Sequence, residues 1–503
     1  MSRNTAQQPP PASTKEALMS TASTGSRTAQ RQVADLPCPR GLPLVGNLLQ
    51  LSPARLHLIL ERWAAELGTP YRFQVGSIPI TIWTDPELIQ QIMRERPHRY
   101  RRYQPIEAVL DEMGCNGLFS AEGAAWEPQR RLVMQALSIP TIKAFYPTLA
   151  DITGRLRARW LRAAERSETV EMTDDLKRYT VDVTSALAFG EDPRTLERDH
   201  GVIQEHLERI LPSVMGRINA LFPYWRYFKL PADRKLDQSL AEVHRYVDAM
   251  MARARERMRD EPAQTPRNLL EAMLVQQQDA RAEPGAPPIT DAQIRANVLT
   301  ILLAGEDTTA DSIAWTLPYL AADPRLQTHL GELARRVLGE ASVCPDYATL
   351  KELDIFEAIC IEATRLRPVA AVHSFEPLED VVLDGVALPK GTRMFFVARP
   401  AMIDAKHFAD PQRYDPWRWM HKREASGEPE AHGGPHDVRA YLQFGAGPRV
   451  CPGRHLATVE MRLALSMLMN EFEIEMAIDP AQINEVSAFT MVPDTMPVRL
   501  RKR

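Results

Sequence analysis

The chain has 503 residues, of which 44% are hydrophobic and 25% are charged. These values are ordinary for a globular protein and exclude a wholly disordered chain, a collagen and a coiled-coil rod. Lys and Arg total 61 against 65 for Asp and Glu, and the resulting net charge of −4 does not suit a general nucleic-acid binder.

Residues 1–35 are rich in Ser, Thr, Ala, Gln and Pro and poor in acidic residues, which predicts a disordered tail. The basic residues in this segment are also compatible with a mitochondrial transit peptide, but no amphipathic apolar face accompanies them. No stretch approaches the ~18 apolar residues of a transmembrane span. Five scattered cysteines without a CxxC pair suit a reducing compartment, so we expect a soluble cytoplasmic protein of bacterial type.

From residue 36 onward, the pattern predicts a mainly α fold with a small β portion. The expected elements are, in chain order, a helix from Pro53 to Gly68 capped by Ser52, a hairpin of Tyr71–Val75 and Ile80–Trp83, helices from Pro86 to Leu366, strands Val381–Leu383 and Arg393–Val397, a helix after Pro452, and strands Phe472–Met476 and Val498–Leu500. Breaker-rich segments at 279–288 and 422–435 are expected to be loops.

A long central helix is expected to start at Thr290, which forms a capping box with Gln293. If it continues to Ala322, it is about 50 Å long at ~1.5 Å per residue. Pro318 lies inside this stretch and is expected either to kink the helix or to end it.

The most informative segment is Phe444-Gly-Ala-Gly-Pro-Arg-Val-Cys-Pro-Gly453. Glycines, Gly445 among them, permit a positive φ and a close approach of the chain to a flat ligand. A thiolate in such a loop, here Cys451, can ligate haem iron, and Arg449 is placed to pair with a haem propionate. A lone cysteine would more often be a buried structural residue, but the complete spacing, beginning with Phe444, argues against that.

With this motif the sequence resembles the cytochrome P450 family of haem-thiolate monooxygenases, and the resemblance extends from Leu36 to Leu500. It implies a single domain, 36–503, that holds haem b between the central helix and the cysteine loop. It also implies O2 and a hydrophobic small molecule as substrates. No flavin or ferredoxin region follows, so we expect a monomer that receives electrons, originally from NAD(P)H, through a separate ferredoxin or flavodoxin.

The segment Ala304-Gly-Glu-Asp-Thr-Thr309 lies in the middle of the central helix. The resemblance implies that Asp307 and Thr308 deliver protons to dioxygen, with Glu306 as a further candidate for the relay. Gly305 costs about 1 kcal/mol in a helix interior relative to Ala and is expected to leave room for a ligand. A solvent-exposed polar face is the alternative, but the apolar run before this segment favours burial.

Trp126 and Arg130 are four residues apart and share one helix face. The resemblance makes both of them haem-propionate partners, whereas a core tryptophan beside a surface arginine is the alternative. Many relatives carry a further basic residue after the position of Pro368. This chain has no Arg or Lys there, and His373 is the candidate substitute.

Glu362 and Arg365 have the spacing of a salt bridge on one helix face. The resemblance implies a buried triad with Arg413, which supports the fold rather than the chemistry. By matched position, the substrate pocket is lined by Ala304, Val369, Ala371 and Phe489, and the lid segments are Arg99–Phe119 and Pro212–Leu230. The second lid segment is aromatic and basic, so it either contacts a membrane surface or packs as a connection between helices.

Basic residues are expected to gather near the cysteine and to attract an acidic electron donor; these are Arg130, Arg131, Arg439, Arg449 and Arg454. Three alternatives to the monooxygenase stay open. The first is a haem-thiolate peroxygenase or isomerase, and the second is a haem-free binding scaffold. The third is a zinc site at Cys451 and His455, which no neighbouring Cys or His completes.

Overall fold

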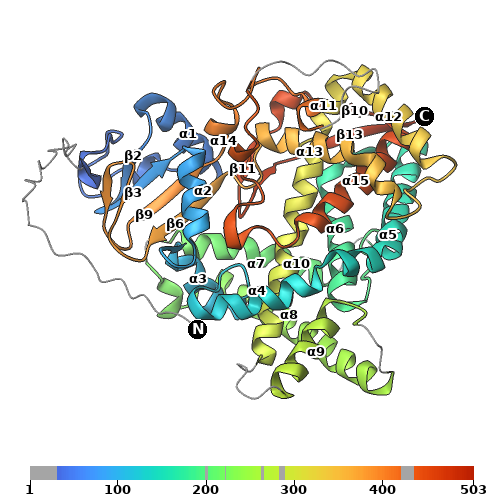
Figure 1. Ribbon diagram of the computed structural model, residues 1–503, viewed down its shortest axis with the longest axis horizontal. Coiled ribbons are helices and arrows are strands. Elements are labelled where there is room, and N and C mark those ends of the chain that lie inside the picture. Colours follow the sequence, from blue (N-terminus) through green and yellow to red (C-terminus); the bar gives the residue numbers. More distant parts are fainter. Residues whose placement is uncertain (1–30, 199–201, 221, 262–265, 283–288, 421–434) are drawn as a thin grey trace, which may run out of the picture.

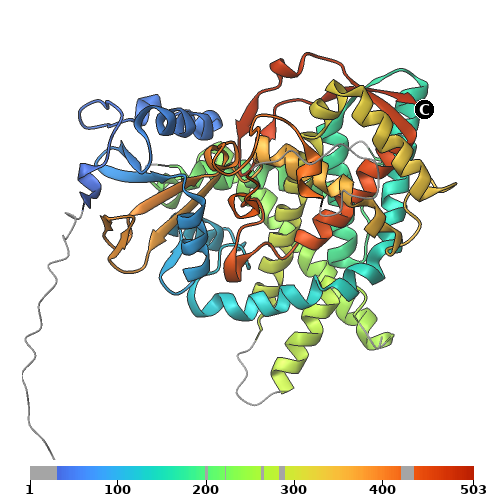
Figure 2. The ribbon, with the colours of Figure 1, turned by 45° about the horizontal axis from the view of Figure 1, so that its top comes forward.

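The structure, a computed structural model, describes residues 31–198, 202–220, 222–261, 266–282, 289–420 and 435–503. It is mainly helical with a small β portion, which confirms the predicted fold class. The strands of the largest sheet lie on one side of the molecule and most helices lie on the other, with α10 (Asp291–Ala314) running between them (Figure 1). The same division is visible in the second view (Figure 2).

The remaining α-helices vary from one turn to eight turns. They are α1 Leu56–Leu67, α2 Pro86–Glu95, α3 Gln104–Glu112, α4 Trp126–Ala136, α5 Ile139–Glu165, α6 Met172–Phe189, α7 Val202–Ile218, α8 Pro231–Asp260, α9 Leu269–Ala282, α11 Leu317–Ala322, α12 Pro324–Leu338, α13 Asp354–Leu366, α14 Arg399–Met402 and α15 Arg454–Glu471.

The strands are short. They are β1 Arg31–Gln32, β2 Tyr71–Val75, β3 Ile78–Trp83, β4 Tyr100–Arg102, β5 Thr169–Glu171, β6 Val372–Pro377, β7 Val381–Leu383, β8 Val386–Leu388, β9 Arg393–Val397, β10 Phe472–Met476, β11 Glu485–Ser487, β12 Met491–Pro493 and β13 Pro497–Lys502. The largest sheet has the order β2-β3-β9-β6-β4, in which only β3 and β9 are parallel. Smaller sheets have the orders β1-β8-β7, β10-β13-β5 and β11-β12.

The central helix starts with the predicted capping box. The backbone N–H of Thr290 donates to Gln293 Oε1 at 2.8 Å, and the N–H of Gln293 donates to Thr290 Oγ1 at 3.2 Å. The helix ends at Ala314, about 36 Å from its start at ~1.5 Å per residue. Pro318 belongs to the first turn of α11, where its missing N–H costs nothing, so the prediction of one helix to Ala322 is wrong.

Other boundaries also differ from the prediction. Residues 31–35, assigned to the tail, are ordered because β1 pairs in parallel with β8, and the N–H of Arg31 donates to the carbonyl of Gly385 at 3.0 Å. Residues 279–282 belong to α9 rather than to a loop. Residues 1–30, 283–288 and most of the loop expected at 422–435 lie outside the described part of the chain.

The carboxylate of Glu362 joins α13 to the segment that leads toward the cysteine loop. Both Glu362 and Arg365 are fully buried, and two guanidinium nitrogens of Arg365 donate to the two Glu362 oxygens at 2.9 Å. The second arginine is Arg418, whose Nε donates to Glu362 Oε1 at 3.1 Å, and Trp419 Nε1 donates to Oε2 at 2.9 Å. The assignment of Arg413 is therefore wrong, because its side chain is exposed and only its carbonyl accepts from Arg365.

Arg418→Ala is expected to lower the free energy of unfolding by about 3–5 kcal/mol, since removing one partner leaves the Glu362 carboxylate buried with less compensation. Arg413→Ala is the matched control and is expected to change it by less than about 0.5 kcal/mol, as ordinary surface substitutions do. Urea unfolding of both variants measures the difference. A larger loss of unfolding free energy in Arg413→Ala than in Arg418→Ala would show that Arg413 is the second arginine of the triad.

Candidate functional site

The loop that carries Cys451 is held in a tight fold just before α15. The N–H of Cys451 donates to the carbonyl of Phe444 at 2.8 Å. Gly445 and Gly447 have φ values of +70° and +68°, which other residues rarely adopt. A Cβ at Gly447 would lie 2.5 Å from the carbonyl oxygen of Met93, so only glycine allows the loop to approach α2 this closely.

The sulfur of Cys451 is suited to ligate a metal ion rather than to act as a free nucleophile. Burial raises the pKa of the thiol, against the opposing effects of the Gly453 N–H and the Arg130 guanidinium. A thiolate at such a position needs a strong positive partner, and a bound metal ion is one. Within the described residues, no group of three or more Cys, His, Asp or Glu side chains could hold a metal, which argues against zinc. His455 instead pairs with the hydroxyl of Tyr347.

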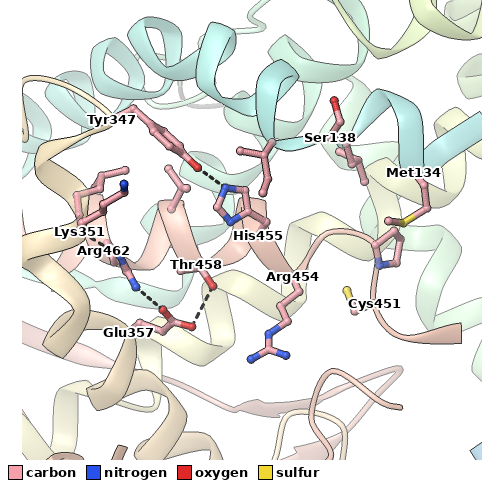
Figure 3. A pocket seen from close by; sticks show the side chains of 15 residues that line it. Met134, Ser138, Tyr347, Lys351, Glu357, Cys451, Arg454, His455, Thr458 and Arg462 are labelled. Carbon is pink, nitrogen blue, oxygen red and sulfur yellow. Dashed lines mark hydrogen bonds and ion pairs between the residues drawn. The ribbon is translucent and has the colours of Figure 1, made fainter. Parts of the chain in front are cut away.

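A cavity of about 520 Å³ opens beside Cys451 (Figure 3). Its walls come from the α4–α5 junction, from α13 and from α15, and the residues include Met134, Ile139, Tyr347, Lys351, Glu357, Cys451, Arg454, His455 and Arg462. Arg462 is neutralised by Glu357 at 2.7 Å, whereas Arg454 and Lys351 are exposed. The cavity therefore brings exposed positive charge close to the sulfur.

A second group of charges lies between the cysteine loop and β4. Arg96 and Arg449 each donate to the carboxylate of Glu122 at 2.9 Å, and the backbone N–H of Arg102 donates to it at 3.0 Å. Buried nitrogen atoms without a hydrogen-bond partner remain on all three arginines and on His373. One carboxylate therefore faces three guanidinium groups that have unused donors.

The pKa values in this group report the same excess of positive charge. Burial and the neighbouring arginines lower the pKa of Arg102 to about 9 and that of Arg449 to about 10. Burial, together with Arg102 and Arg96, lowers the pKa of His373 to about 4. An anion with several acceptor oxygens would relieve this arrangement, and the two propionates of a haem have that chemistry. The residues present thus fit a haem beside Cys451.

The sequence motifs identify part of this group. Trp126 lies at the start of α4, and the guanidinium of Arg449 lies 4.6 Å from the centre of its ring. Arg130, one turn later, donates to the carbonyl of Val450 at 2.8 Å. Arg96 and Arg102 were missed in the sequence, because they lie among five arginines between positions 94 and 102, and no motif marks which of these point inward.

The acid–alcohol segment lies where α10 passes the site. The hydroxyl of Thr308 donates to the carbonyl of Ala304 at 2.8 Å, and Ala304 is exposed although its preceding neighbours are buried. The carboxylate of Asp307 forms an ion pair with Lys177 of α6 at 3.0 Å. Glu306 is buried, and its carbonyl accepts from the hydroxyl of Thr180 at 2.7 Å.

Gly305 has a different role from the one expected. A Cβ at this position would lie 2.5 Å from the Cγ2 of Thr184 on α6. The glycine therefore allows α6 and α10 to approach each other, and the idea that it leaves room for a ligand is wrong. Ala304 is the small residue that faces open space.

The residues expected to line the pocket lie on adjoining segments. Val369 and Ala371 are buried, and the N–H of Met491 donates to the carbonyl of Val369 at 2.9 Å, which places the β11–β12 hairpin beside them. Phe489, at the turn of this hairpin, is half-buried, with its ring 5.3 Å from that of Phe119 in the first lid segment.

The second lid segment packs against α3 through one aromatic side chain and exposes others, and contact with a membrane surface stays a prediction. Trp225 is buried and its Nε1 donates to Glu112 of α3 at 2.8 Å, so it packs as a connection between helices. Phe222, Tyr227 and Phe228 are more than half exposed. None of the helices in the described ranges combines the length and apolar character needed to cross a bilayer.

Comparisons with known proteins agree with this geometry. The family described as Cytochrome P450 matches residues 36–498. The mitochondrial 25-hydroxyvitamin D-1 alpha hydroxylase of Homo sapiens is 26% identical over 93% of this chain and 92% of its own length, and Cytochrome P450 3A41 of Mus musculus is 24% identical over 88% and 85%. The crystal structure of the cytochrome P450DA heme domain has the same fold, with a TM-score of 0.80 at 24% identity over 93% of this chain and 98% of that chain. Relatives named chloroplastic also match, so the cytoplasmic location stays a prediction.

Arg102→Gln is expected to accelerate the transfer of haem from the holoprotein to apomyoglobin about tenfold, because a charge-assisted hydrogen bond contributes about 1.5–3 kcal/mol. Arg439→Gln is the control, since Arg439 is exposed and paired with Asp437. The transfer is followed by the change in Soret absorbance. Equal transfer rates for both variants would show that Arg102 does not contact a propionate.

Proposed function

The chain belongs to the cytochrome P450 family of haem-thiolate monooxygenases, and on that premise we propose that it uses O2 to hydroxylate or epoxidise a hydrophobic small molecule. The observation that carries the proposal is the combination of one metal-suited thiol, a group with more guanidinium groups than carboxylates, and an acid–alcohol pair on the central helix. The name of the human relative, a hydroxylase of a vitamin D compound, supports oxidation of an apolar substrate.

Bound haem supplies the activation of O2, which the thiolate of Cys451 promotes by donating electron density. Arg102, Arg449, Trp126 and His373 would hold its propionates, with Arg130 fixing the loop through Val450. These residues would orient the cofactor beside Cys451.

The residues of α10 handle protons. The Thr308 hydroxyl donates to the Ala304 carbonyl, so its oxygen is free to accept a hydrogen bond from a water or an acid near the exposed face of Ala304. The ion pair with Lys177 of α6 fixes the position of the Asp307 carboxylate, one residue before Thr308 in the chain. An acid and an alcohol in sequence form a short path for protons from solvent to a buried site.

The substrate is proposed to be hydrophobic because the expected pocket residues are small or aromatic. Ala304, Val369, Ala371 and Phe489 carry no charge, and Phe119 packs against the last of them. An apolar wall with few polar groups favours an apolar ligand.

Thr308→Ala is expected to reduce the product formed per NAD(P)H by about tenfold or more in reactions driven by O2, because the alcohol step of the proton path is lost. Reactions driven by hydrogen peroxide are expected to be affected less, since peroxide already carries the protons. Both proteins should show the red-shifted Soret band of a thiolate-ligated, reduced, CO-bound haem.

The same experiment distinguishes the alternatives. Faster product formation with peroxide than with O2 in the wild type would indicate a peroxygenase. Conversion of a peroxide without external electrons would indicate an isomerase. Absence of the CO-bound band in well-folded protein would leave a haem-free scaffold.

We propose an acidic ferredoxin as the electron donor, docking at the cavity beside Cys451. Two apolar side chains, Met134 and Ile139, are 42% and 59% exposed there, and the cavity also has the exposed cations Lys351 and Arg454. Arg131 is exposed one turn before Met134 on α4. An apolar centre with a charged rim is typical of a transient interface.

The other arginines expected in this patch contribute less. Arg449 is buried beside Glu122, Arg130 bonds to a carbonyl, and Arg439 is neutralised by Asp437. The free positive charge is therefore smaller than the sequence suggested.

Arg454→Glu is expected to slow reduction by an acidic ferredoxin about tenfold at low salt and to weaken the dependence of the rate on ionic strength, because steering between opposite charges is lost. Arg62→Glu on α1 makes the same charge change on another surface and is the control. Stopped-flow reduction under CO measures both. No salt dependence in the wild type would contradict the proposed docking surface.

A further inference from the structure

A second carboxyl group lies on α10 one turn beyond Asp307. Asp311 is fully buried, and its Oδ1 has no hydrogen-bond partner. Its Oδ2 accepts from the hydroxyl of Thr490 at 3.4 Å. Residues four apart on a helix lie on the same face, so the Asp311 carboxyl and that of Asp307 are neighbours.

One cation serves this group of acids. Lys177 of α6 contacts Asp307 at 3.0 Å and also lies within electrostatic reach of Asp311 and of Glu306. Although burial lowers the pKa of Lys177, the carboxylates of Asp307 and Asp311 raise it above its usual value, so this lysine carries its charge at neutral pH.

The buried member of the group is the one whose pKa is shifted toward the protonated form. Burial and the adjacent Asp307 charge raise the pKa of Asp311 well above its usual value, against the weaker opposing effects of Lys177 and Thr490. A charged lysine, a carboxylate and a neutral carboxylic acid together carry no net charge, which is the favourable state in a buried site.

The proposed function requires a group that gives a proton to Thr308. The ion pair with Lys177 uses the carboxylate form of Asp307, and a carboxylate has no proton to give to Thr308. A neutral acid one turn away can supply that proton if Lys177 follows the negative charge from Asp307 to Asp311.

Resting on the monooxygenase function proposed above, we propose that Asp311 stores a proton and exchanges it with Asp307 while Lys177 moves from one carboxylate to the other. The O–H bond on Asp311 breaks and an O–H bond on Asp307 forms, and the ammonium group keeps its three protons. The summed charge of the three groups is zero before and after. Asp307 is then a proton donor beside Thr308, and Asp311 is a positioning residue that acts through it.

Water can restore the proton afterwards. The side chains of Lys177 and Asp307 are 28% and 16% exposed, whereas Asp311 is enclosed. The Lys177–Asp307 pair therefore takes up a proton from solvent, and Asp311 is reprotonated through this pair.

The hairpin that carries Phe489 is part of the same arrangement. Thr490 follows Phe489 in the turn and donates to Asp311, so a movement of the turn on substrate binding changes a hydrogen bond to the stored acid. Thr490 is half-buried, and Thr490→Val removes its hydroxyl donor with little change in the shape of the side chain.

Infrared spectroscopy of the haem-loaded full-length protein in H2O and D2O tests the stored proton directly. Asp311→Asn is expected to remove one protonated-carboxyl band at neutral pH, and Thr490→Val is expected to shift that band. Glu460→Gln is the matched control, since Glu460 is a second enclosed acid among the described residues whose pKa lies well above its usual value, and it should remove a different band. Spectra of Asp311→Asn that keep every band of the wild type would overturn the proposal.

Turnover tests the exchange. Asp311→Asn is expected to lower product per NAD(P)H about tenfold and to raise the solvent deuterium isotope effect, because a proton-transfer partner is lost. The dissociation constant of a hydrophobic ligand, measured by its Soret shift, should change less than twofold. Unchanged coupling and isotope effect in a variant that has lost its carboxyl band would refute the exchange.

The two proposals fail in different ways. A wild type that forms no product from O2 but loses the band in Asp311→Asn refutes the monooxygenase and keeps the stored proton. A wild type that forms product but has no such band refutes the stored proton alone.

Discussion

The buried carboxylate of Glu362 is the interaction on which the geometry around the sulfur depends. It accepts hydrogen bonds from Arg365 on its own helix and from Arg418 and Trp419 on the segment that precedes the cysteine loop. Removal of a hydrogen-bond partner from a fully buried carboxylate costs several kcal/mol of folding free energy, so α13 and this segment stay together. Farther along, the Tyr441 hydroxyl pairs with Thr364 of α13, which extends the same attachment toward Cys451.

Two buried groups in which acids and bases differ in number lie in this part of the molecule, one around Glu122 and one on α10. The group around Glu122 has more guanidinium groups than carboxylates and lacks an anion. The group on α10 has more carboxyls than its one lysine can pair with, which is the basis for the proton proposed on Asp311. Each imbalance would destabilise an isolated domain, since buried charge is costly. The extra guanidinium groups would bind the two propionates of the cofactor, and the extra carboxyl would serve a reaction that consumes protons.

Local patterns predicted many of the elements. The capping box at Thr290, the β2–β3 hairpin and the strands β7 and β9 depend on neighbouring residues, and the structure contains them. The strand β6 was missed because its residues, Val372–Pro377, mix polar and apolar side chains without regular alternation. Arg413 was mistaken for Arg418 because the spacing of a motif does not tell which of two nearby arginines points inward.

The sequence by itself determined the thiol at Cys451, the glycines that shape its loop, and the acid–alcohol pair at Asp307 and Thr308, because each of these is written in consecutive residues. Only the tertiary structure decided what those groups contact. Arg96, Arg102 and Glu122 meet Arg449 from more than 300 residues away in the chain, and Lys177 and Thr490 reach the acids of α10 from separate elements. Such partners depend on how helices and strands pack, and the balance of charge in a buried site is a property of that packing rather than of any one segment.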